Sequence, residues 1–211
     1  MRFGGIVLCG GESKRMRLPK ATLPFGPELM LQRVVRLLSD VVEPIVVVAA
    51  AGQRLPELPA GTIVTHDERE SRGPLEGLRA GLMAIAPHVD AAYATSCDTP
   101  LLSGAFVERM TAELGEHNAV VPVDGEFYHP LAAVYRTDTV ASMEQLLNQE
   151  KLRTCDIFES LTTNRVSIQE LRGVDSKLLT LMNVNTPAEY LKALELAGCR
   201  IELAVKEALE L

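Results

Sequence analysis

The chain has 211 residues, of which 47% are apolar and 23% charged, and it contains no tryptophan, so its composition is that of an ordinary globular protein. A formal net charge of −7 makes a broad nucleic-acid-binding surface unexpected. No apolar run reaches the roughly 18 residues of a membrane span, and four dispersed cysteines without a CxxC pair argue against a zinc ribbon or a disulfide framework.

The first residues run directly into an apolar segment and lack the long apolar region of a signal peptide. A reduced, cytoplasmic environment is therefore expected. The length favours one α/β domain, which we place at residues 1–198, followed by a helical tail at residues 199–211.

Apolar strands alternate with helix-periodic segments along the chain. The predicted strands are 5–8, 44–49, 62–65, 91–96, 119–122 and 131–135, with a hairpin turn at Asp124-Gly125, and the predicted helices are 29–38, 75–85, 106–114 and 139–147. Strands joined by single helices form βαβ crossovers, so this order predicts a doubly wound, mostly parallel, Rossmann-like sheet in three layers.

Beyond residue 150 the pattern indicates a helical pair, one more strand at Leu178–Val184 and a helix that starts at Pro187. Thr186 is suited to cap that helix, because Thr accepts hydrogen bonds at an N-cap and Pro is favoured at the first helical position. The segment Ile201–Leu211 is expected to be helical.

The first strand stops at a glycine pair, Gly10-Gly11, which is followed by a concentration of positive charge. A glycine turn after a buried strand can present bare backbone N–H groups to an anion. The cations that follow are Lys14, Arg15, Arg17 and Lys20, against the single acid Glu12. Neither the P-loop nor the GxGxxG pattern is present, yet the combination predicts a polyphosphate site.

Two further groups of polar residues follow predicted strands, Asp67 after the third and Cys97-Asp98 after the central one. Ligands of doubly wound sheets bind beyond the carboxyl ends of the strands, so these residues and the glycine loop should converge. One carboxylate beside a polyphosphate is how Mg²⁺ is usually held, which makes Asp98 the candidate metal ligand. The alternative is that Asp98 caps a turn.

The segment that starts at Gly10 contains, in this order, the glycine pair, Ser13, Arg15-Met16, Lys20 and Leu23–Gly26. This order of residues resembles the signature of sugar- and cofactor-nucleotidyltransferases. Within this group the chain looks most like the molybdenum cofactor guanylyltransferases of MobA type. Departures from the family pattern are Cys9 for Ala, Arg17 for Gly and Pro19 for Asp. The resemblance implies that the residues that bind the nucleotide are Leu8, Cys9, Gly10, Gly11, Lys20, Asp67 and Asp98.

The resemblance extends to Tyr190 in the right order. The segment His129-Pro130-Leu131 matches a family segment on the side that receives the pterin, although a lone His is more often structural. Asn183 and Asn185 lie in a segment like the family's NVNTP, where Asn185 could serve the metal, the acceptor or only the helix start. We therefore place His129, Asn183 and Asn185 in the acceptor-binding half.

What the resemblance implies is transfer of GMP from GTP to a molybdopterin-type acceptor, Mo-molybdopterin, with release of pyrophosphate. Arg15, Lys20 and Asp98 are the expected catalytic residues, with Mg²⁺ as cofactor and no covalent nucleophile. Such an enzyme is expected to be a monomer or a weak homo-oligomer, with no nucleic-acid or membrane partner.

Three alternatives stay open at this point. One is a related transferase that uses CTP or makes a nucleotide sugar. Another is a non-catalytic nucleotide-binding protein. Arg17 and Pro19 depart from the family pattern, and residues 49–52 lack the Asn that the family often has after the second strand, as such a protein would. A dehydrogenase would share the fold but lacks the fingerprint.

Overall fold

The computed structural model describes residues 1–10, 15–16, 18–67 and 72–209. An eight-stranded mixed sheet forms the centre, in the order β10-β7-β9-β6-β1-β4-β5, with β8 added alongside β7. The strands are β1 (Phe3–Leu8), β4 (Ile45–Ala49), β5 (Ile63–His66), β6 (Ala91–Ser96), β7 (Ala119–Asp124), β8 (Phe127–Tyr128), β9 (Ala133–Arg136) and β10 (Thr163–Ser167). The doubly wound α/β prediction is confirmed.

Parallel pairing runs through the half of the sheet that carries the glycine loop. β1 pairs in parallel with β4 and β6, and β4 pairs in parallel with β5. All five residues of β4 are buried, as its continuous β-branched sequence predicted, because helices cover both faces. β9 is antiparallel to both of its neighbours, β6 and β7, and the turn at Asp124-Gly125 pairs β7 with β8.

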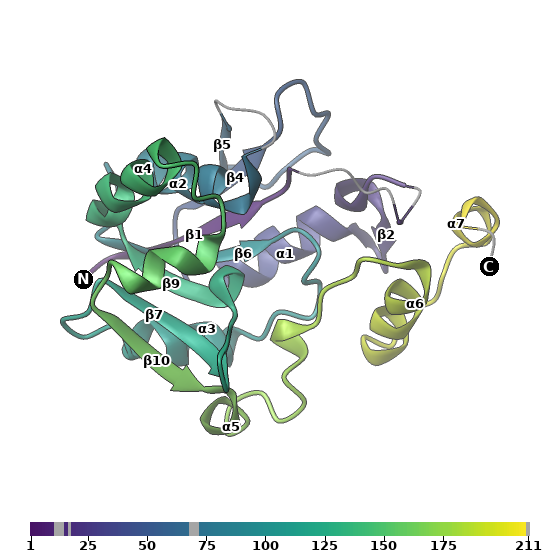
Figure 1. Ribbon diagram of the computed structural model, residues 1–211. Helices are drawn as coiled ribbons and strands as arrows, with labels where there is room; N and C mark the ends of the chain where they lie inside the picture. The colour runs from purple at the N-terminus through teal and green to yellow at the C-terminus, as the bar shows by residue number, and fades with distance from the viewer. Residues whose placement is uncertain (11–14, 17, 68–71, 210–211) are drawn as a thin grey trace.

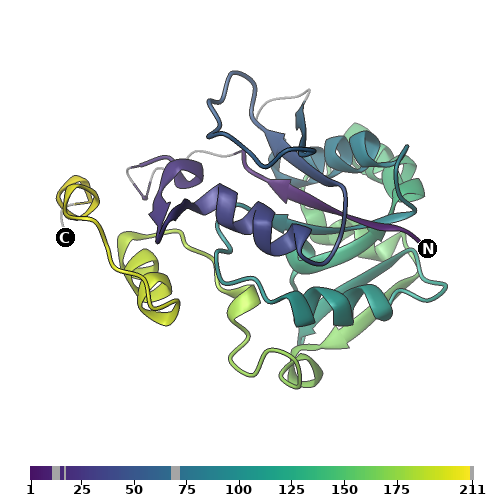
Figure 2. The same cartoon turned by 180° about the vertical axis from the view of Figure 1, so that it is seen from behind.

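Helices pack on both faces of this sheet (Figures 1 and 2). α1 (Met30–Ser39) and α3 (Gly104–Ala112) share one core with alternate strand residues such as Val7 and Val47. α2 (Gly73–Ile85) and α4 (Val140–Asn148) share the other core with Ile6 and Val48. Successive side chains of each central strand point to opposite faces of the sheet, so each strand contributes residues to both cores. α2 approaches β1 so closely that a Cβ on Gly81 would lie 2.6 Å from Ile6 Cγ2.

A third, smaller core lies to one side of the sheet. It joins the hairpin of β2 (Pro24–Phe25) and β3 (Glu28–Leu29) to α6 (Pro187–Leu196) and α7 (Leu203–Ala208) (Figure 1). Tyr190 of α6 is fully buried in it, and its hydroxyl donates a hydrogen bond to the Pro24 carbonyl. The residues of the hairpin's first strand therefore pack against residues more than 150 positions later in the chain.

Short helices make up the remaining connections. They are η1 (Lys20–Thr22), η2 (Pro130–Ala132), η3 (Thr137–Thr139), η4 (Thr154–Glu159), α5 (Ile168–Leu171) and η5 (Leu179–Leu181). None of the described helices is long and apolar enough to cross a membrane.

One predicted element is wrong. Residues Leu178–Val184 do not form a strand: Leu178 adopts a left-handed conformation with φ of 51°, and a 3-10 turn follows at η5. The last strand of the sheet is β10 instead, which pairs with β7 at the sheet edge.

Candidate active site

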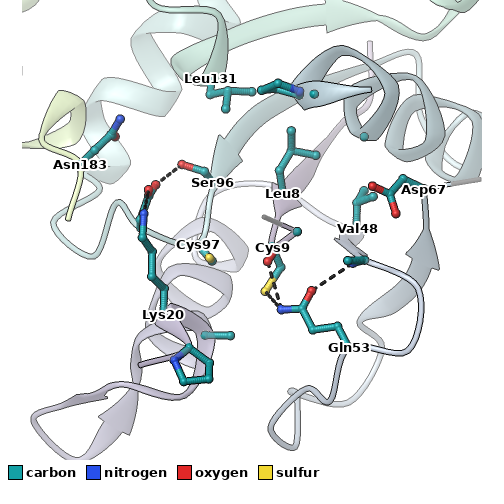
Figure 3. Close-up of a pocket in the computed structure, with 18 of the residues that line it drawn as sticks. Leu8, Cys9, Lys20, Val48, Gln53, Asp67, Ser96, Cys97, Leu131 and Asn183 are labelled. Atoms are coloured by element: carbon teal, nitrogen blue, oxygen red, sulfur yellow. Dashed lines mark hydrogen bonds and ion pairs between the residues drawn. The ribbon is translucent and has the colours of Figure 1, made fainter. Parts of the chain in front are cut away.

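Seven of the predicted site residues line a cavity of about 1010 Å³ at the carboxyl ends of the parallel strands. Strand ends from β1, β4, β5 and β6 line it, together with the start of α2 (Figure 3). The lining residues are Leu8, Cys9, Gly10, Leu18, Pro19, Lys20, Ala21, Val48, Ala50, Gln53, Asp67, Gly73, Pro74, Gly77, Ser96, Cys97, Asp98, Leu131 and Asn183. The convergence follows from parallel pairing, which brings these strand ends to one edge of the sheet.

Lys20, Asp98 and Asn185 meet at this edge. The Lys20 ammonium lies 2.7 Å from Asp98 Oδ2 and 2.7 Å from Asn185 Oδ1. The Lys20 and Asp98 side chains are only 17% and 15% exposed, so solvent screens this ion pair less than a surface pair. A single cation is thus held between a carboxylate and an amide oxygen that are 87 residues apart in sequence.

Asp98 is anchored on its other side as well. Its Oδ1 accepts a hydrogen bond from the Ser96 hydroxyl at the end of β6 (Figure 3). The loop that carries Asp98 is tied to α1, because Arg33 Nε donates to the Pro100 carbonyl at 2.8 Å. The Arg33 guanidinium also lies 4.9 Å from the centre of the Phe25 ring. Arg33 therefore connects the Asp98 loop with the hairpin that follows Lys20.

Asn185 is positioned by the start of α6. The Glu189 carboxylate accepts hydrogen bonds from the backbone N–H groups of Asn185 and Thr186, at 2.8 and 2.9 Å. Thr186 caps the helix by accepting from the Glu189 N–H, as predicted, which completes a capping box. These backbone hydrogen bonds hold the pKa of Glu189 below its usual value. Val184 N–H donates to the Asp98 carbonyl at 2.8 Å and joins this segment to the Asp98 loop.

Two cysteines lie side by side at the ends of β1 and β6. Leu8 and Ser96 are register partners, so Cys9 and Cys97 follow on adjacent strands. The hydrogen bond from Cys97 to Cys9 lowers the pKa of the Cys9 thiol, and the same contact together with burial raises the pKa of Cys97. The groups that act on the two thiols in the described residues are each other, Gln53, Asp98 and Lys20, with no histidine among them, so this is not a Cys–His nucleophile.

Gln53 is a lining residue that the sequence reasoning missed. Its Nε2 donates to the Cys9 carbonyl at 3.1 Å and to Cys9 Sγ at 3.4 Å, and its Oε1 accepts from Ala50 N–H at 3.0 Å (Figure 3). Residues 49–52 were expected to leave the loop after the second strand without a polar side chain. The polar side chain is instead the carboxamide of Gln53, the next residue after this stretch. The sequence signal that could have found it is the glycine directly before it, because Gly52 adopts a φ of 70° and so allows a tight turn.

The other predicted site residues divide into two groups. Leu8, Cys9, Gly10, Asp67 and Asn183 line the cavity, as does Leu131, which lies two residues after His129. His129 itself is half-buried outside the lining, and burial lowers its pKa. Arg15 is exposed and also outside the lining, but it lies near enough to Glu189 to help lower its pKa. Gly11 lies outside the described residues.

Chemically, the described part of the cavity offers oxygen ligands and the Lys20 ammonium rather than a closed metal cage. No group of three or more His, Cys, Asp or Glu residues gathers around a common point in the described residues. A divalent ion there would need ligands from a substrate, which is how Mg²⁺ usually binds beside phosphates.

The sequence matches the family described as "MobA-like NTP transferase domain" over residues 5–163. A relative from Mycobacterium avium, named "Probable molybdenum cofactor guanylyltransferase", is 38% identical over 195 residues, which cover 90% of this chain and 93% of the relative. The "Molybdenum cofactor guanylyltransferase" of Desulfosudis oleivorans is 33% identical over 191 residues, with 90% and 93% covered.

Solved structures agree on the fold. Molybdopterin-guanine dinucleotide biosynthesis protein A from Archaeoglobus fulgidus superimposes with a TM-score of 0.75 at 20% identity, covering 94% of this chain and 99% of its own. The 2-C-methyl-D-erythritol 4-phosphate cytidylyltransferase of Thermus thermophilus gives 0.69 at 14% identity, with 94% and 100% covered. The family predicted from the glycine-loop signature is thus confirmed, and the chain belongs to the MobA-like NTP transferases, which are nucleotidyltransferases.

Proposed function

We propose that this protein transfers GMP from GTP to the molybdenum cofactor, forming the guanine dinucleotide cofactor and pyrophosphate. The names of the relatives supply the substrate class. The observation that carries the chemistry is the Lys20 ammonium held between Asp98 and Asn185 at the rim of a cavity built from strand ends. This arrangement brings one cation and two oxygen ligands to the place where a sheet of this type binds nucleotides.

Nucleotidyltransferases of this family generally use a divalent metal ion, and we propose Mg²⁺ here. The donor set fits, because Asp98 Oδ2 and Asn185 Oδ1 are hard oxygen ligands that already point at one common cation, Lys20 Nζ. Asp98 would hold the ion, with Asn185 as its neighbour. When bound, Mg²⁺ would neutralise charge on the nucleotide phosphates.

In the proposed reaction a phosphate oxygen of the acceptor attacks the α-phosphorus of GTP. A new phosphoanhydride bond forms while the bond to the departing pyrophosphate breaks. Lys20 and Arg15 would stabilise the negative charge that develops on the phosphoryl oxygens. Leu8, Cys9, Gly10, Gly11 and Asp67 are assigned to nucleotide binding. Positioning and charge neutralisation supply the catalysis, because no covalent intermediate is required.

The acceptor is assigned to the half of the cavity rim formed by the second part of the chain. Leu131 and Asn183 line that side, and Asn185 is held next to it by Glu189. His129 belongs to the same segment as Leu131, and burial lowers its pKa, which favours the uncharged imidazole. The cytoplasmic location and the monomeric or weakly oligomeric state stay predictions from the sequence.

Equilibrium binding of GTP, CTP, ATP and UTP with Mg²⁺ tests the proposal, using the wild type, Asp98→Ala and the exposed control Asp138→Ala. We expect GTP to bind best, and the affinity to fall in Asp98→Ala alone. Addition of the molybdenum cofactor should then release pyrophosphate. A preference for CTP would reassign the protein to the cytidylyl relatives, and binding without pyrophosphate release would favour a non-catalytic protein.

A further inference from the structure

Cys9 and Cys97 form a pair of thiols whose redox chemistry has no part in the proposed reaction, although Cys9 is assigned to the nucleotide-binding residues. They are two of the four cysteines of the chain, and both are buried, with 4% and 7% of their surface exposed. The other two, Cys155 and Cys199, are half-buried and lie in different parts of the fold: Cys155 packs beside the core of α2 and α4, and Cys199 beside that of α6 and α7.

The sheet brings the two thiols together. Leu8 and Ser96 are partners in the parallel ladder of β1 and β6, and Cys97 N–H donates to the Leu8 carbonyl at 2.9 Å. Adjacent strands lie about 4.8 Å apart, and residues one step beyond a register pair point to the same face. Both side chains belong to the core on the α1 and α3 face. This spacing is within the range of Cα separations that a disulfide can bridge, about 4.4 to 6.8 Å.

The pair also belongs to the wall of the nucleotide cavity. Cys9 and Cys97 both line it, and they stand directly before Gly10 and Asp98 in the sequence (Figure 3). The small exposed fraction of each cysteine is accompanied by a place in the wall of this cavity, which is the route by which we expect a small oxidant to reach the pair. The Gln53 carboxamide lies 3.4 Å from Cys9 Sγ, so the pair has a polar neighbour on the cavity side.

We propose that Cys9 and Cys97 are a redox-active dithiol that a peroxide converts into an intramolecular disulfide, and that this disulfide obstructs nucleotide binding. In the first step one thiolate attacks a peroxide oxygen, which forms a sulfenic acid and leaves water after proton transfer. In the second step the other sulfur displaces the sulfenic hydroxyl as a second water. Two thiols lose two electrons, and hydrogen peroxide is reduced to two molecules of water. A dithiol reductant reverses the bridge by thiol–disulfide exchange.

The effect on nucleotide binding rests on the proposed function, whereas the bridge itself does not. A disulfide fixes both sulfur positions at about 2.05 Å from each other, so the hydrogen bond from Gln53 to Cys9 Sγ cannot persist unchanged. It also ties the backbone before Gly10 to the backbone before Asp98, which restricts both sides of the proposed phosphate and metal site.

The test uses the reduced full-length chain treated with a small excess of hydrogen peroxide. We expect two of the four thiols to disappear, a Cys9–Cys97 cross-link in the peptide map, and at least a tenfold loss of Mg-GTP affinity that a dithiol reductant restores. Saturating Mg-GTP should slow bridge formation. The matched control is Cys155→Ser/Cys199→Ser, which should form the bridge and lose affinity as the wild type does.

Cys9→Ser and Cys97→Ser should each abolish the bridge, and the comparison of oxidised with reduced wild type remains decisive if either variant fails to fold. Peroxide treatment that yields no Cys9–Cys97 cross-link overturns the dithiol, as does a cross-link that leaves Mg-GTP affinity unchanged. If reduced wild type binds no nucleotide, the proposed function fails, while the thiol count and the peptide map still decide whether the bridge forms.

Discussion

Lys20 is the residue on which the site depends most directly. Its ammonium is held by Asp98 and Asn185, the two groups whose oxygen atoms suit a divalent ion. A metal ion with two positive charges and an ammonium cannot share this position without strong repulsion, because like charges at about 4 Å repel by several kcal/mol near a protein surface. We infer that Lys20 leaves Asp98 when metal and nucleotide bind, and that it then contacts phosphate.

Lys20→Ala should therefore change two quantities in opposite directions. Turnover should fall by at least ~10²-fold, since removing one preorganised contact to developing charge usually costs about 3 kcal/mol. The affinity for Mg²⁺ without nucleotide should rise by about tenfold, because the competing ammonium is gone. Pyrophosphate release and calorimetric titration with Mg²⁺ measure the two effects.

The control for this experiment is Lys192→Ala, which removes an exposed lysine that pairs with Glu195 on α6. It should change neither quantity. Near-normal turnover in Lys20→Ala would contradict the role of Lys20, and an unchanged Mg²⁺ affinity would contradict the exchange between the ammonium and the metal.

Individual site residues could be predicted where a strand ends and a polar residue follows at once. Asp98 closely follows the buried strand β6 and Asp67 directly follows the edge strand β5, so the parallel sheet determines where they lie. Gln53 could not be found in this way, because it comes four residues after β4 and turns back to the Cys9 carbonyl. Arg33 was missed for a related reason: on an amphipathic helix, an arginine looks like a solvated residue until the loop it contacts is known.

At the scale of elements, the central strands were predicted well, whereas the edge strand β10 was missed. β4 is apolar throughout and β6 is buried at five of its six residues, and their predicted bounds differ from the observed ones by at most one residue. β10 has the polar sequence TNRVS with a single buried residue, since it pairs only with β7 at the sheet edge. The apolar segment Leu178–Val184 looked more like a strand than β10 did, but it forms a 3-10 turn followed by a loop that bonds to the Asp98 carbonyl through Val184 N–H.

The start of α6 is the element that holds Asn185 in place, and its stability should depend on pH through Glu189. The pKa of Glu189 is lower in the folded protein than its usual value of 4.5. Between these two values the unfolded chain binds more protons than the folded one, so stability falls as the pH drops through this range. Above pH 4.5, the Glu189 carboxylate makes its full contribution to the free energy of unfolding.

Glu189→Gln should lower the free energy of unfolding by about 1 kcal/mol at pH 7, and this difference from wild type should disappear as the pH falls through the folded pKa. Ser167→Ala is the matched comparison, since its hydroxyl caps α5 by accepting from Gln169 N–H and does not titrate: it should cost about 1 kcal/mol at both ends of the range. Denaturant unfolding at several pH values measures both. A Glu189→Gln deficit that persists undiminished in acid would contradict this account.

At the scale of the whole molecule, the site lies where two packed units meet. Asp98 lies in the loop that follows β6 of the sheet, whereas Lys20 and Asn185 adjoin the third core of the hairpin, α6 and α7. Tyr190 joins the hairpin to α6 through its hydrogen bond to Pro24, and burial raises its pKa to about 12. The relative position of the sheet and the third core therefore sets the distance between the lysine, the carboxylate and the amide.

The last helix tests how far this third core extends. The sequence predicted a boundary at residue 198 and a separate tail, and that boundary stays a prediction. Leu209, directly after α7, is 2% exposed and belongs to the third core, whereas Leu203 at the start of the same helix is 71% exposed. A buried leucine cut to alanine costs about 2 to 5 kcal/mol, and an exposed one usually costs less than about 0.5 kcal/mol.

Leu209→Ala should therefore lower the free energy of unfolding by about 2 kcal/mol, the low end of that range because α7 is short and close to its own fraying end. Leu203→Ala should leave the free energy of unfolding within about 0.5 kcal/mol of wild type. If both variants unfold like the wild type, α7 contributes nothing to the third core and residues 199–211 behave as the separate tail. If Leu209→Ala alone is destabilised and also binds Mg-GTP more weakly, the third core reaches from α7 to Lys20, and the end of the chain helps to position the proposed catalytic lysine.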